Sequence, residues 1–368
     1  MKIAQIAPLM ESVPPRLYGG TERIVSWLCE ELVHQGHDVT LFASGDSITS
    51  AALVPCATEA LRLNPAVKDW VPHYMILMDR VRQMASQFDI LHFHIDAVHF
   101  PLFSEMAGRT VTTLHGRQDL PDMKALYYAF PNMPLVSISD AQRAPIPDAN
   151  FTSTVLHGLP ADTHKPTFSP KGDYLAFLGR ISPEKRPDRA IAIARAAGMK
   201  LKIAAKVDKA DSEYWTRVIE PMTKTADVEF VGEIGERDKA EFLGNAAALL
   251  FPIDWPEPFG LVMIEAMACG TPVLAFECGS VPEVLCDGVT GRIVKSMDEA
   301  IAAVPELLRL DRRRIRAVFE RDFSARRMAT DYVNIYRRLI EADGETAPEI
   351  KSATRTSLLQ SAPRALTN

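Results

Sequence analysis

Short apolar runs alternate with amphipathic stretches along most of the chain. Apolar runs of about four to eight residues are typical of buried strands in a parallel sheet, and amphipathic stretches between them are typical of covering helices. The sequence therefore predicts an α/β fold. The expected strands are residues 2–7, 38–43, 90–95, 110–114, 135–138, 174–178, 201–205, 228–231, 247–251 and 272–275, and the expected helices include 21–35, 186–197 and 324–341.

The segment over residues 162–172 breaks this rhythm, because it is polar and contains Pro166 and Pro170. Such a composition marks a loop, so we expect it to link two domains. Each half has the size and pattern of a doubly wound domain, in which ligands bind beyond the carboxyl ends of the strands. The expected organisation is a first domain over 1–165, a second over 172–323, a final helix over 324–342 and a disordered tail over 343–368, which is rich in Ala, Thr, Ser and Pro.

Composition narrows the class of protein. The chain has 368 residues, of which 47% are hydrophobic and 24% charged, as in soluble globular proteins. A net charge of −6 gives no support to nucleic-acid binding, and the basic cluster over residues 312–316 is expected to be a solvated helix face. No apolar run approaches the roughly 18 residues of a membrane span. Five cysteines without C-x-x-C spacing favour free thiols and a cytoplasmic location.

Residues 254–270, which read DWPEPFGLVMIEAMACG, carry the most specific chemistry. They predict a proline-braced loop that holds Glu257 and a helix that begins at Gly260. A helix N-terminus binds phosphate, because it presents unpaired backbone N–H groups and the positive end of the helix dipole. Glu265 lies about 7–8 Å along the helix axis, where its carboxylate can accept hydrogen bonds from a sugar diol. The segment therefore predicts a nucleotide-sugar site.

The alternative is an ordinary loop and helix with two solvated glutamates, since glutamate is usually exposed. However, the run from Phe259 to Met267 is almost wholly apolar apart from Gly260 and Glu265. The helix should therefore be buried. A carboxylate inside it needs a partner that offsets its desolvation, which favours a functional Glu265.

The same segment resembles the E-x7-E region of the retaining family-4 glycosyltransferases of the GT-B fold. The resemblance covers about residues 1–340 and implies two doubly wound Rossmann-like domains that face each other across a cleft. It also implies that the final helix crosses back to brace the first domain. Further matching segments are 18–20 (YGG), 113–116 (TLHG), 137–140 (SISD), 177–185 (FLGRISPEK), 270–273 (GTPV) and 279–283 (GSVPE).

Two cations follow the first strand of the second half. Arg180 and Lys185 could neutralise a diphosphate as it becomes the leaving group, which stabilises the transition state more than the ground state. In the family, an Arg and a Lys in this motif contact the diphosphate, and the resemblance gives that role to these two residues. The alternative is that Arg180 pairs with a nearby carboxylate and Lys185 is solvated.

The resemblance assigns further residues. Gly19 and Gly20 would form a loop that closes on the sugar phosphate, and Tyr18 replaces the lysine of related glucan synthases, which argues against glycogen or starch synthesis. His115 lies on the ligand-binding edge of the sheet and, by resemblance, approaches the donor sugar. The alternative is a histidine that caps a loop. Ile234 lies where family members hold the base through backbone groups.

The favoured reaction is transfer of a hexose, with glucose from UDP-glucose as the favoured donor, to a hydroxyl of a small soluble acceptor such as a pterin or a sugar metabolite. Configuration at the sugar would be retained. Two alternatives stay open: a sugar-nucleotide epimerase of the same fold, and a non-catalytic sugar-nucleotide-binding protein. Neither a nucleic-acid partner nor stable membrane insertion is expected. The expected catalytic residues are His115, Glu257, Arg180 and Lys185, and the expected substrate-binding residues are Gly19, Gly20, Arg180, Lys185, Ile234, Glu257, Phe259, Gly260, Leu261 and Glu265.

His92 and His94 alternate along the strand 90–95, so both side chains point to one face. With Asp96 they suggest a metal site, but this set is too small without a confirmed third ligand. We therefore prefer a place in the wall of the acceptor pocket. The chain has no Asp-x-Asp motif, which fits transfer without a metal or other cofactor.

Overall fold

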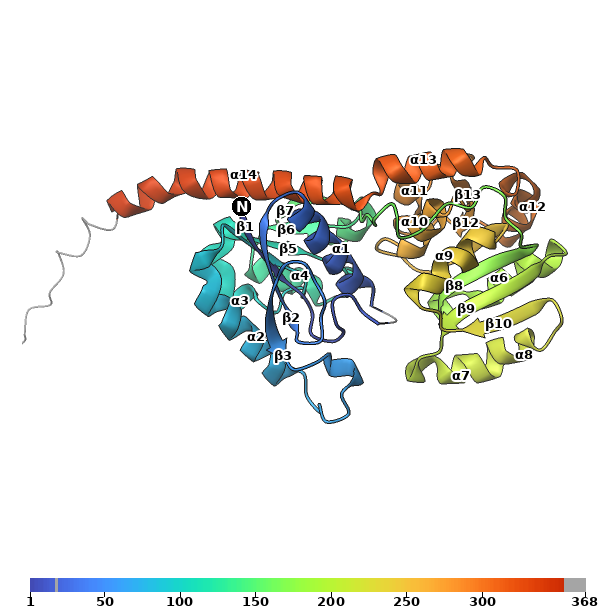
Figure 1. Cartoon of the computed structure of the whole chain (residues 1–368), viewed down its shortest axis with the longest axis horizontal. Coiled ribbons are helices and arrows are strands. Elements are labelled where there is room, and N and C mark those ends of the chain that lie inside the picture. Colours follow the sequence, from blue (N-terminus) through green and yellow to red (C-terminus); the bar gives the residue numbers. More distant parts are fainter. Residues whose placement is uncertain (17–18, 354–368) are drawn as a thin grey trace, which may run out of the picture.

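Two parallel sheets organise the chain into two lobes (Figure 1). In the computed structural model, which describes residues 1–16 and 19–353, the first sheet has the order β3-β2-β1-β4-β5-β6-β7 and the second β10-β9-β8-β11-β12-β13. In each sheet the strand order reverses beside the strand that comes first along the chain, between β1 and β4 and between β8 and β11. In doubly wound sheets such a reversal opens a crevice beyond the carboxyl ends of the strands. The predicted α/β class with two Rossmann-like domains is confirmed.

The first lobe contains the five strands expected in that half and two more, β3 and β7, at the sheet edges. Both edge strands are only partly buried. β7 has a single apolar residue, Phe151, and Pro55 interrupts the apolar run of β3, so the hydrophobic pattern did not reveal them. The elements are β1 (Lys2–Ile6), α1 (Gly20–His34), β2 (Asp38–Ser44), β3 (Ala52–Ala57), η1 (Leu61–Leu63), α2 (Val71–Met84), η2 (Ala85–Gln87), β4 (Ile90–Phe93), α3 (Phe100–Phe103), η3 (Ser104–Arg109), β5 (Thr110–Thr113), α4 (Met123–Ala129), β6 (Leu135–Ser137), α5 (Asp140–Arg143) and β7 (Phe151–Thr154).

The second lobe repeats the pattern and adds β13 at the edge next to β12. Its two middle strands, β8 and β11, are hydrogen-bonded neighbours, and the chain segments that follow them carry the candidate site. The elements are β8 (Tyr174–Arg180), η4 (Pro183–Lys185), α6 (Pro187–Ala196), β9 (Lys200–Lys206), η5 (Lys209–Asp211), α7 (Ser212–Tyr214), η6 (Trp215–Ile219), α8 (Glu220–Thr223), β10 (Val228–Gly232), α9 (Glu236–Asn245), β11 (Ala248–Phe251), α10 (Leu261–Ala268), β12 (Val273–Phe276), α11 (Val281–Val284), β13 (Gly291–Val294), α12 (Met297–Leu307) and α13 (Arg312–Asp322).

The basic cluster of α13 is not a wholly solvated face, so that expectation is wrong for two of its members. The Arg316 guanidinium is buried and donates to the carbonyl oxygens of His164 at 2.8 Å and Ala268 at 2.6 Å. Arg312 donates to the Gly244 carbonyl at 2.9 Å. The spacing of four residues places both arginines on the inner face of the helix, where their donors pair with backbone carbonyls.

The last helix, α14 (Ala325–Ala353), leaves the second lobe and runs across the first, as the red helix in Figure 1 shows. It packs on α1 and η3. The helix continues beyond residue 342, so the expectation of disorder is wrong for residues 343–353, and 354–368 lie outside the described residues.

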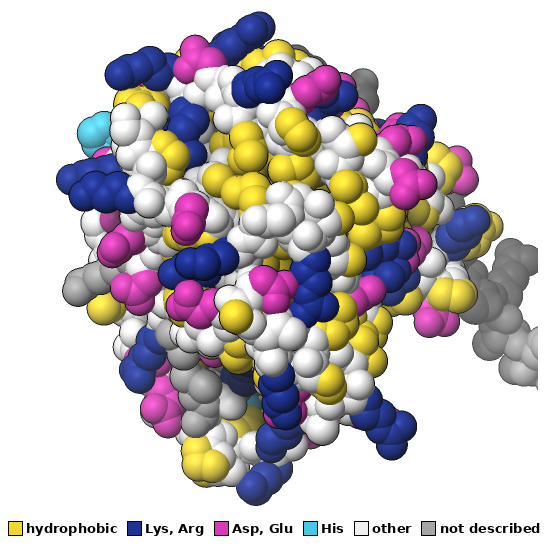
Figure 2. Space-filling view, turned by 90° about the vertical axis from the view of Figure 1, so that its right-hand side faces the viewer, with side chains coloured by type: hydrophobic (Ala, Val, Ile, Leu, Met, Phe, Trp, Pro, Cys, Tyr) yellow, Lys and Arg dark blue, Asp and Glu magenta, His cyan; other side chains and the backbone are white. Residues whose placement is uncertain are grey.

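The outer end of the second lobe mixes charges of both signs (Figure 2). Ion pairs of this lobe include Arg195 with Asp227 and Lys202 with Glu229. Among the described residues, every helix is too short or too polar to cross a membrane.

Two tyrosine hydroxyls fix α14 in the first lobe. The Tyr336 hydroxyl accepts a hydrogen bond from Gln5 Nε2 at 3.1 Å and lies 2.7 Å from His92 Nδ1. The Tyr332 hydroxyl lies 2.8 Å from Thr113 Oγ1. Both tyrosine side chains are fully buried, so their hydroxyls need these partners.

Replacing Tyr336 with Phe should lower the free energy of unfolding by about 1–3 kcal/mol, because it leaves polar atoms of Gln5 and His92 buried without a partner. Urea unfolding followed by circular dichroism measures the change. Tyr128→Phe is the matched control, since Tyr128 is 88% exposed, and it should shift stability by less than about 0.5 kcal/mol. Equal midpoints for the two variants would contradict this account of how α14 is held.

Candidate functional site

A cavity of about 560 Å³ lies between the two lobes and takes its walls from both. This size is in the range of small-molecule sites. Every described residue that the sequence singled out as catalytic or substrate-binding lines it, whereas Tyr18 lies outside the described residues. The first lobe contributes Gly19, Gly20 and His115, and the second contributes Arg180, Lys185, Ile234, Glu257, Phe259, Gly260, Leu261 and Glu265.

The N-terminus of α10 opens onto this cavity. Gly260 is its N-cap with a left-handed φ of 79°, and a Cβ there would lie 2.8 Å from Met263 Cε. Only glycine therefore fits the position without strain. Leu261 and Val262 of the first turn also line the cavity, and no acidic side chain occupies that turn. The helix thus presents its positive end and its first backbone N–H groups to a ligand.

Glu265 has the partner that its burial requires. Its Oε1 accepts a hydrogen bond from Lys239 Nζ at 2.7 Å, and its side chain is buried. Burial alone would raise the pKa of the Glu265 carboxyl, but the adjacent Lys239 ammonium, helped by the Arg23 guanidinium, outweighs this effect and lowers it. Glu265 is therefore ionised and accepts hydrogen bonds at the cavity wall. Lys239, which also lines the cavity, was not identified from the sequence.

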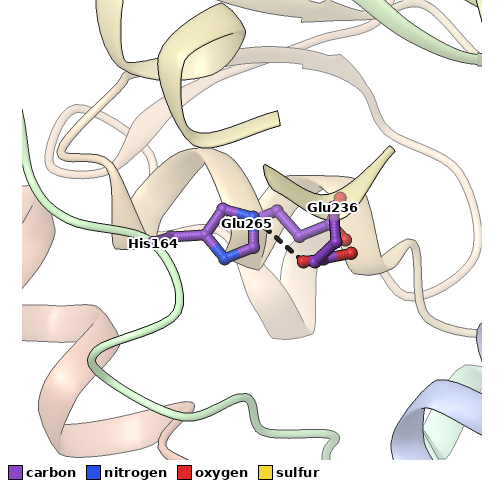
Figure 3. Close-up of side chains that lie close together, drawn as sticks. All are labelled: His164, Glu236 and Glu265. Carbon is purple, nitrogen blue, oxygen red and sulfur yellow. Dashed lines mark ion pairs between the residues drawn. The ribbon is translucent and has the colours of Figure 1, made fainter. Parts of the chain in front are cut away.

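Glu265 also belongs to a cluster of possible metal ligands with His164 and Glu236, whose donor atoms lie within 4.8 Å of one another (Figure 3). His164 Nε2 is 3.5 Å from Glu236 Oε1, the contact drawn as a dashed line. However, Glu236 already lies 3.3 Å from the Lys239 ammonium and 2.9 Å from the Arg23 guanidinium. Two cations thus neutralise the two carboxylates, so a further cation does not fit and the cluster is an ion-pair network.

Glu257 is held on its proline-braced loop by two donors. The Lys185 ammonium forms an ion pair with Glu257 Oε2, and Trp255 Nε1 donates to the same oxygen at 3.0 Å. The Lys185 Nζ also lies 4.9 Å from the centre of the Trp255 ring, within cation–π range. Lys185 is therefore not the solvated side chain of the alternative interpretation. The sequence analysis missed Trp255, although its position two residues before Glu257 was a signal.

Arg180 stands at the end of β8 and pairs with the carboxylate of Glu184. Its guanidinium also lies 3.7 Å from Asp211 and 3.8 Å from Asp208. The carboxylate partner considered in the sequence analysis is thus present. The Arg180 side chain is nevertheless 32% exposed and lines the cavity, so it can reach a ligand from its paired position.

His115 follows β5 and faces the cavity as a neutral imidazole. Burial lowers its pKa to about 3. Its Nε2 lies 2.9 Å from His94 Nδ1, and His94 Nε2 lies 2.8 Å from Gln5 Oε1. The His115 ring also stacks on His157, with centroids 5.4 Å apart. The ring is therefore held from two sides.

His92 and His94 are not among the residues that line the cavity, so their expected place in the acceptor-pocket wall is wrong. His92 lies 2.7 Å from both the Tyr336 hydroxyl and Thr113 Oγ1. Strand alternation did place both histidines on one face, but α14 covers that face. Burial lowers the pKa of each ring well below its ordinary value.

Parts of the chain match known glycosyltransferase families and relatives. The family model "Glycosyl transferases group 1" matches residues 161–319, and "Glycosyltransferase Family 4" matches residues 18–145. The D-inositol 3-phosphate glycosyltransferases of Mycobacterium bovis BCG and Mycobacterium tuberculosis are 34% identical over 159 residues, which is 42% of this chain. The match spans 31% of the length of those relatives.

Solved structures match nearly the whole chain. AviGT4, a glycosyltransferase involved in avilamycin A biosynthesis, is 24% identical with a TM-score of 0.70, covering 92% of this chain and 98% of that one. The sucrose-phosphate synthase of Thermosynechococcus elongatus is 18% identical with a TM-score of 0.75, covering 93% and 99%. The Anabaena HepE complex with UDP and glucose is 16% identical with a TM-score of 0.68, covering 92% and 100%. At these identities the similarity shows the fold.

The buried histidines make stability depend on pH. A folded pKa below the unfolded value of about 6.5 means that the unfolded chain binds more protons, so stability is lost as pH falls below that value. We expect the free energy of unfolding to drop between pH 7.5 and 5, approaching about 1.4 kcal/mol per pH unit for each such histidine. The histidines concerned are His92, His94, His99, His115, His157 and His164.

Urea unfolding at several pH values measures this slope. His99→Gln should reduce it, because burial lowers the pKa of His99 to about 3. His34→Gln is the control and should leave the slope unchanged, since His34 is exposed. Constant or rising stability on acidification would show that these rings are not held neutral.

Proposed function

We propose that this chain, which belongs to the GT-B glycosyltransferases of family 4 and group 1, transfers a hexose from a nucleotide sugar to an acceptor hydroxyl with retention of configuration. UDP-glucose is the proposed donor. The observation that carries the proposal is the convergence of the α10 N-terminus, two cations and two buried carboxylates on one cavity between the lobes. These groups complement the parts of a nucleotide sugar.

The donor would lie along α10. Its diphosphate binds at the backbone N–H groups that open the helix, next to Arg180 and Lys185, and its ribose hydroxyls donate to Glu265, about 7–8 Å further along the axis. The hexose then reaches Glu257. Both of that residue's protein donors contact Oε2, so Oε1 serves as the acceptor for a sugar hydroxyl.

The two cations would carry most of the transition-state stabilisation. As the bond between sugar and diphosphate breaks, negative charge grows on the leaving oxygen, and fixed positive groups beside it lower the barrier without reorganising. The carboxylate partners of Arg180 and Lys185 hold both side chains at the cavity wall beforehand. No metal ion is needed in this scheme.

His115 would act through hydrogen bonding and position, since a ring with a pKa near 3 is a very weak base. We propose that the acceptor hydroxyl attacks on the face that the diphosphate leaves and passes its proton to a departing phosphate oxygen. The enzyme then contributes geometry and charge.

The first lobe would choose the acceptor. Arg62 and Arg117 line the cavity from this lobe with side chains that are 41% and 48% exposed, so each can offer further N–H donors beside its carboxylate partner. Such a wall favours a phosphorylated sugar metabolite over a neutral pterin. The curated relatives carry an inositol phosphate in their name, but they match less than half of this chain. A cytoplasmic setting is proposed because all five cysteines are free thiols.

Release of free nucleotide from a panel of UDP-, GDP- and ADP-sugars tests the proposal. Arg180→Ala and Glu257→Ala should each lower the release rate by about 100-fold or more, as loss of a placed charge-stabilising group does. Lys202→Ala is the control, because Lys202 pairs with Glu229 and is not among the cavity-lining residues. Wild-type rates in both site variants would refute the assignment.

The products separate the alternatives. Proton NMR of a glycosylated product should show the α configuration for a retaining enzyme. An isomerised nucleotide sugar without nucleotide release would instead identify an epimerase, and an unchanged nucleotide sugar that binds would identify a non-catalytic protein.

A further inference from the structure

Two amide side chains brace the loop that carries His115: Gln118 Nε2 donates to the Gly116 carbonyl at 3.2 Å, and Gln142 makes contacts on both sides of His115. Gln142 Nε2 donates to the carbonyl oxygens of Leu114 at 2.9 Å and Gly116 at 2.7 Å, one on each side of His115. Gln142 Oε1 accepts from the Ile138 backbone N–H at 2.9 Å. The side chain is buried, so its four-atom plane has little freedom. The backbone around His115 therefore follows the position of Gln142.

Gln142 sits on α5, and the start of this short helix is tied to the second lobe. The N-cap hydroxyl, Ser139 Oγ, accepts from Gln142 N at 3.0 Å and donates to the Pro258 carbonyl at 2.7 Å. Pro258 lies directly between Glu257 and Phe259 in the donor-side loop. The Ser-x-x-Gln spacing is that of a capping box, and this signal in the sequence was not used.

A second tie from the same lobe is charged. The two oxygens of Glu283, on α11, accept from the backbone N–H groups of Asp140 at 2.6 Å and Ala141 at 2.8 Å. A carboxylate at the start of a helix satisfies amides that have no partner within the helix and complements the helix dipole. The second lobe thus holds α5 at both its N-cap and its first turn.

We propose that Gln142 is a positioning residue for His115, and that Glu283 makes this positioning depend on contact between the lobes. The inference rests on the proposed function. When the lobes separate, α5 loses the Glu283 carboxylate and the Pro258 carbonyl together. Gln142 then no longer fixes the Leu114 and Gly116 carbonyls. His115 consequently reaches its working position only when the donor-side lobe is seated, which protects the donor from reaction in an open cleft.

Backbone hydrogen exchange on the full chain tests the coupling without any ligand. Glu283→Gln keeps the size and shape of the side chain but turns its N–H₂ group toward a backbone N–H, which removes one hydrogen bond to α5. Backbone exchange should therefore accelerate over residues 138–142 and also over residues 114–117. Glu277→Gln is the matched control, because Glu277 pairs with Lys295 of its own lobe, and it should leave both segments unchanged. Faster exchange over 138–142 alone would overturn the coupling.

Kinetics with UDP-glucose as the probe separate positioning from binding. Glu283→Gln should lower kcat for nucleotide release by about tenfold while KM changes by less than about twofold, because the donor-binding groups of the second lobe are untouched. Gln142→Ala should lower kcat at least as much, with faster exchange over 114–117. An unchanged kcat in a variant with altered exchange would overturn the positioning role.

Calorimetric measurement of UDP binding to the wild-type chain distinguishes failure of this inference from failure of the proposed function. Binding together with unchanged exchange over 114–117 in Glu283→Gln would overturn this inference and leave the proposed function standing. Failure to bind UDP would count against the proposed donor, and the exchange comparison would still decide the coupling.

Discussion

Burial of charge in the cleft is the constraint on which the site depends. Glu265 is buried in an apolar helix and requires the Lys239 ammonium. Lys239 also contacts Glu236, and Glu236 in turn pairs with Arg23 of the first lobe. Glu265, which we propose as a donor-binding residue, is thus linked by successive ion pairs to the opposite wall of the cavity. The need to neutralise one carboxylate contributes to bringing the lobes together.

In the first lobe the buried polar groups are neutral, and they satisfy one another by hydrogen bonds. From His115, a buried hydrogen-bond chain runs through His94 and Gln5 to the Tyr336 hydroxyl on α14. Since Gln5 Oε1 accepts, His94 carries its proton on Nε2, and its Nδ1 accepts from His115 Nε2–H. The amide of Gln5 thereby sets the tautomer of the ring at the cavity. The crossing helix α14 therefore does more than brace the first lobe, because its Tyr336 hydroxyl completes this series of hydrogen bonds.

The contacts around His115 support its proposed role as a fixed, neutral group and not as a residue that gains and loses a proton during the reaction. Its ring is fixed by His94 and its backbone by Gln142, and burial keeps it neutral. Chemistry that relies on placed charge and orientation needs such rigidity more than it needs a proton acceptor. The cations that carry charge stand on the other lobe, so the complete site exists only where both lobes meet.

Local patterns in the sequence determined the central strands and the helix that opens at Gly260, because each reflects the burial or backbone geometry of one element. The resemblance to a family supplied other residues around the cavity, among them His115 and Ile234. The edge strands β3, β7 and β13 escaped that analysis, since each is only partly buried and its apolar run is either short or, in β3, interrupted by Pro55. The places of His92 and Arg316 were wrong for a related reason. Alternation or helical spacing shows which face a side chain takes, whereas only the tertiary structure decides what covers that face. The partners of Gln5, Glu265 and Gln142 come from distant segments of the chain, and no local pattern encodes them.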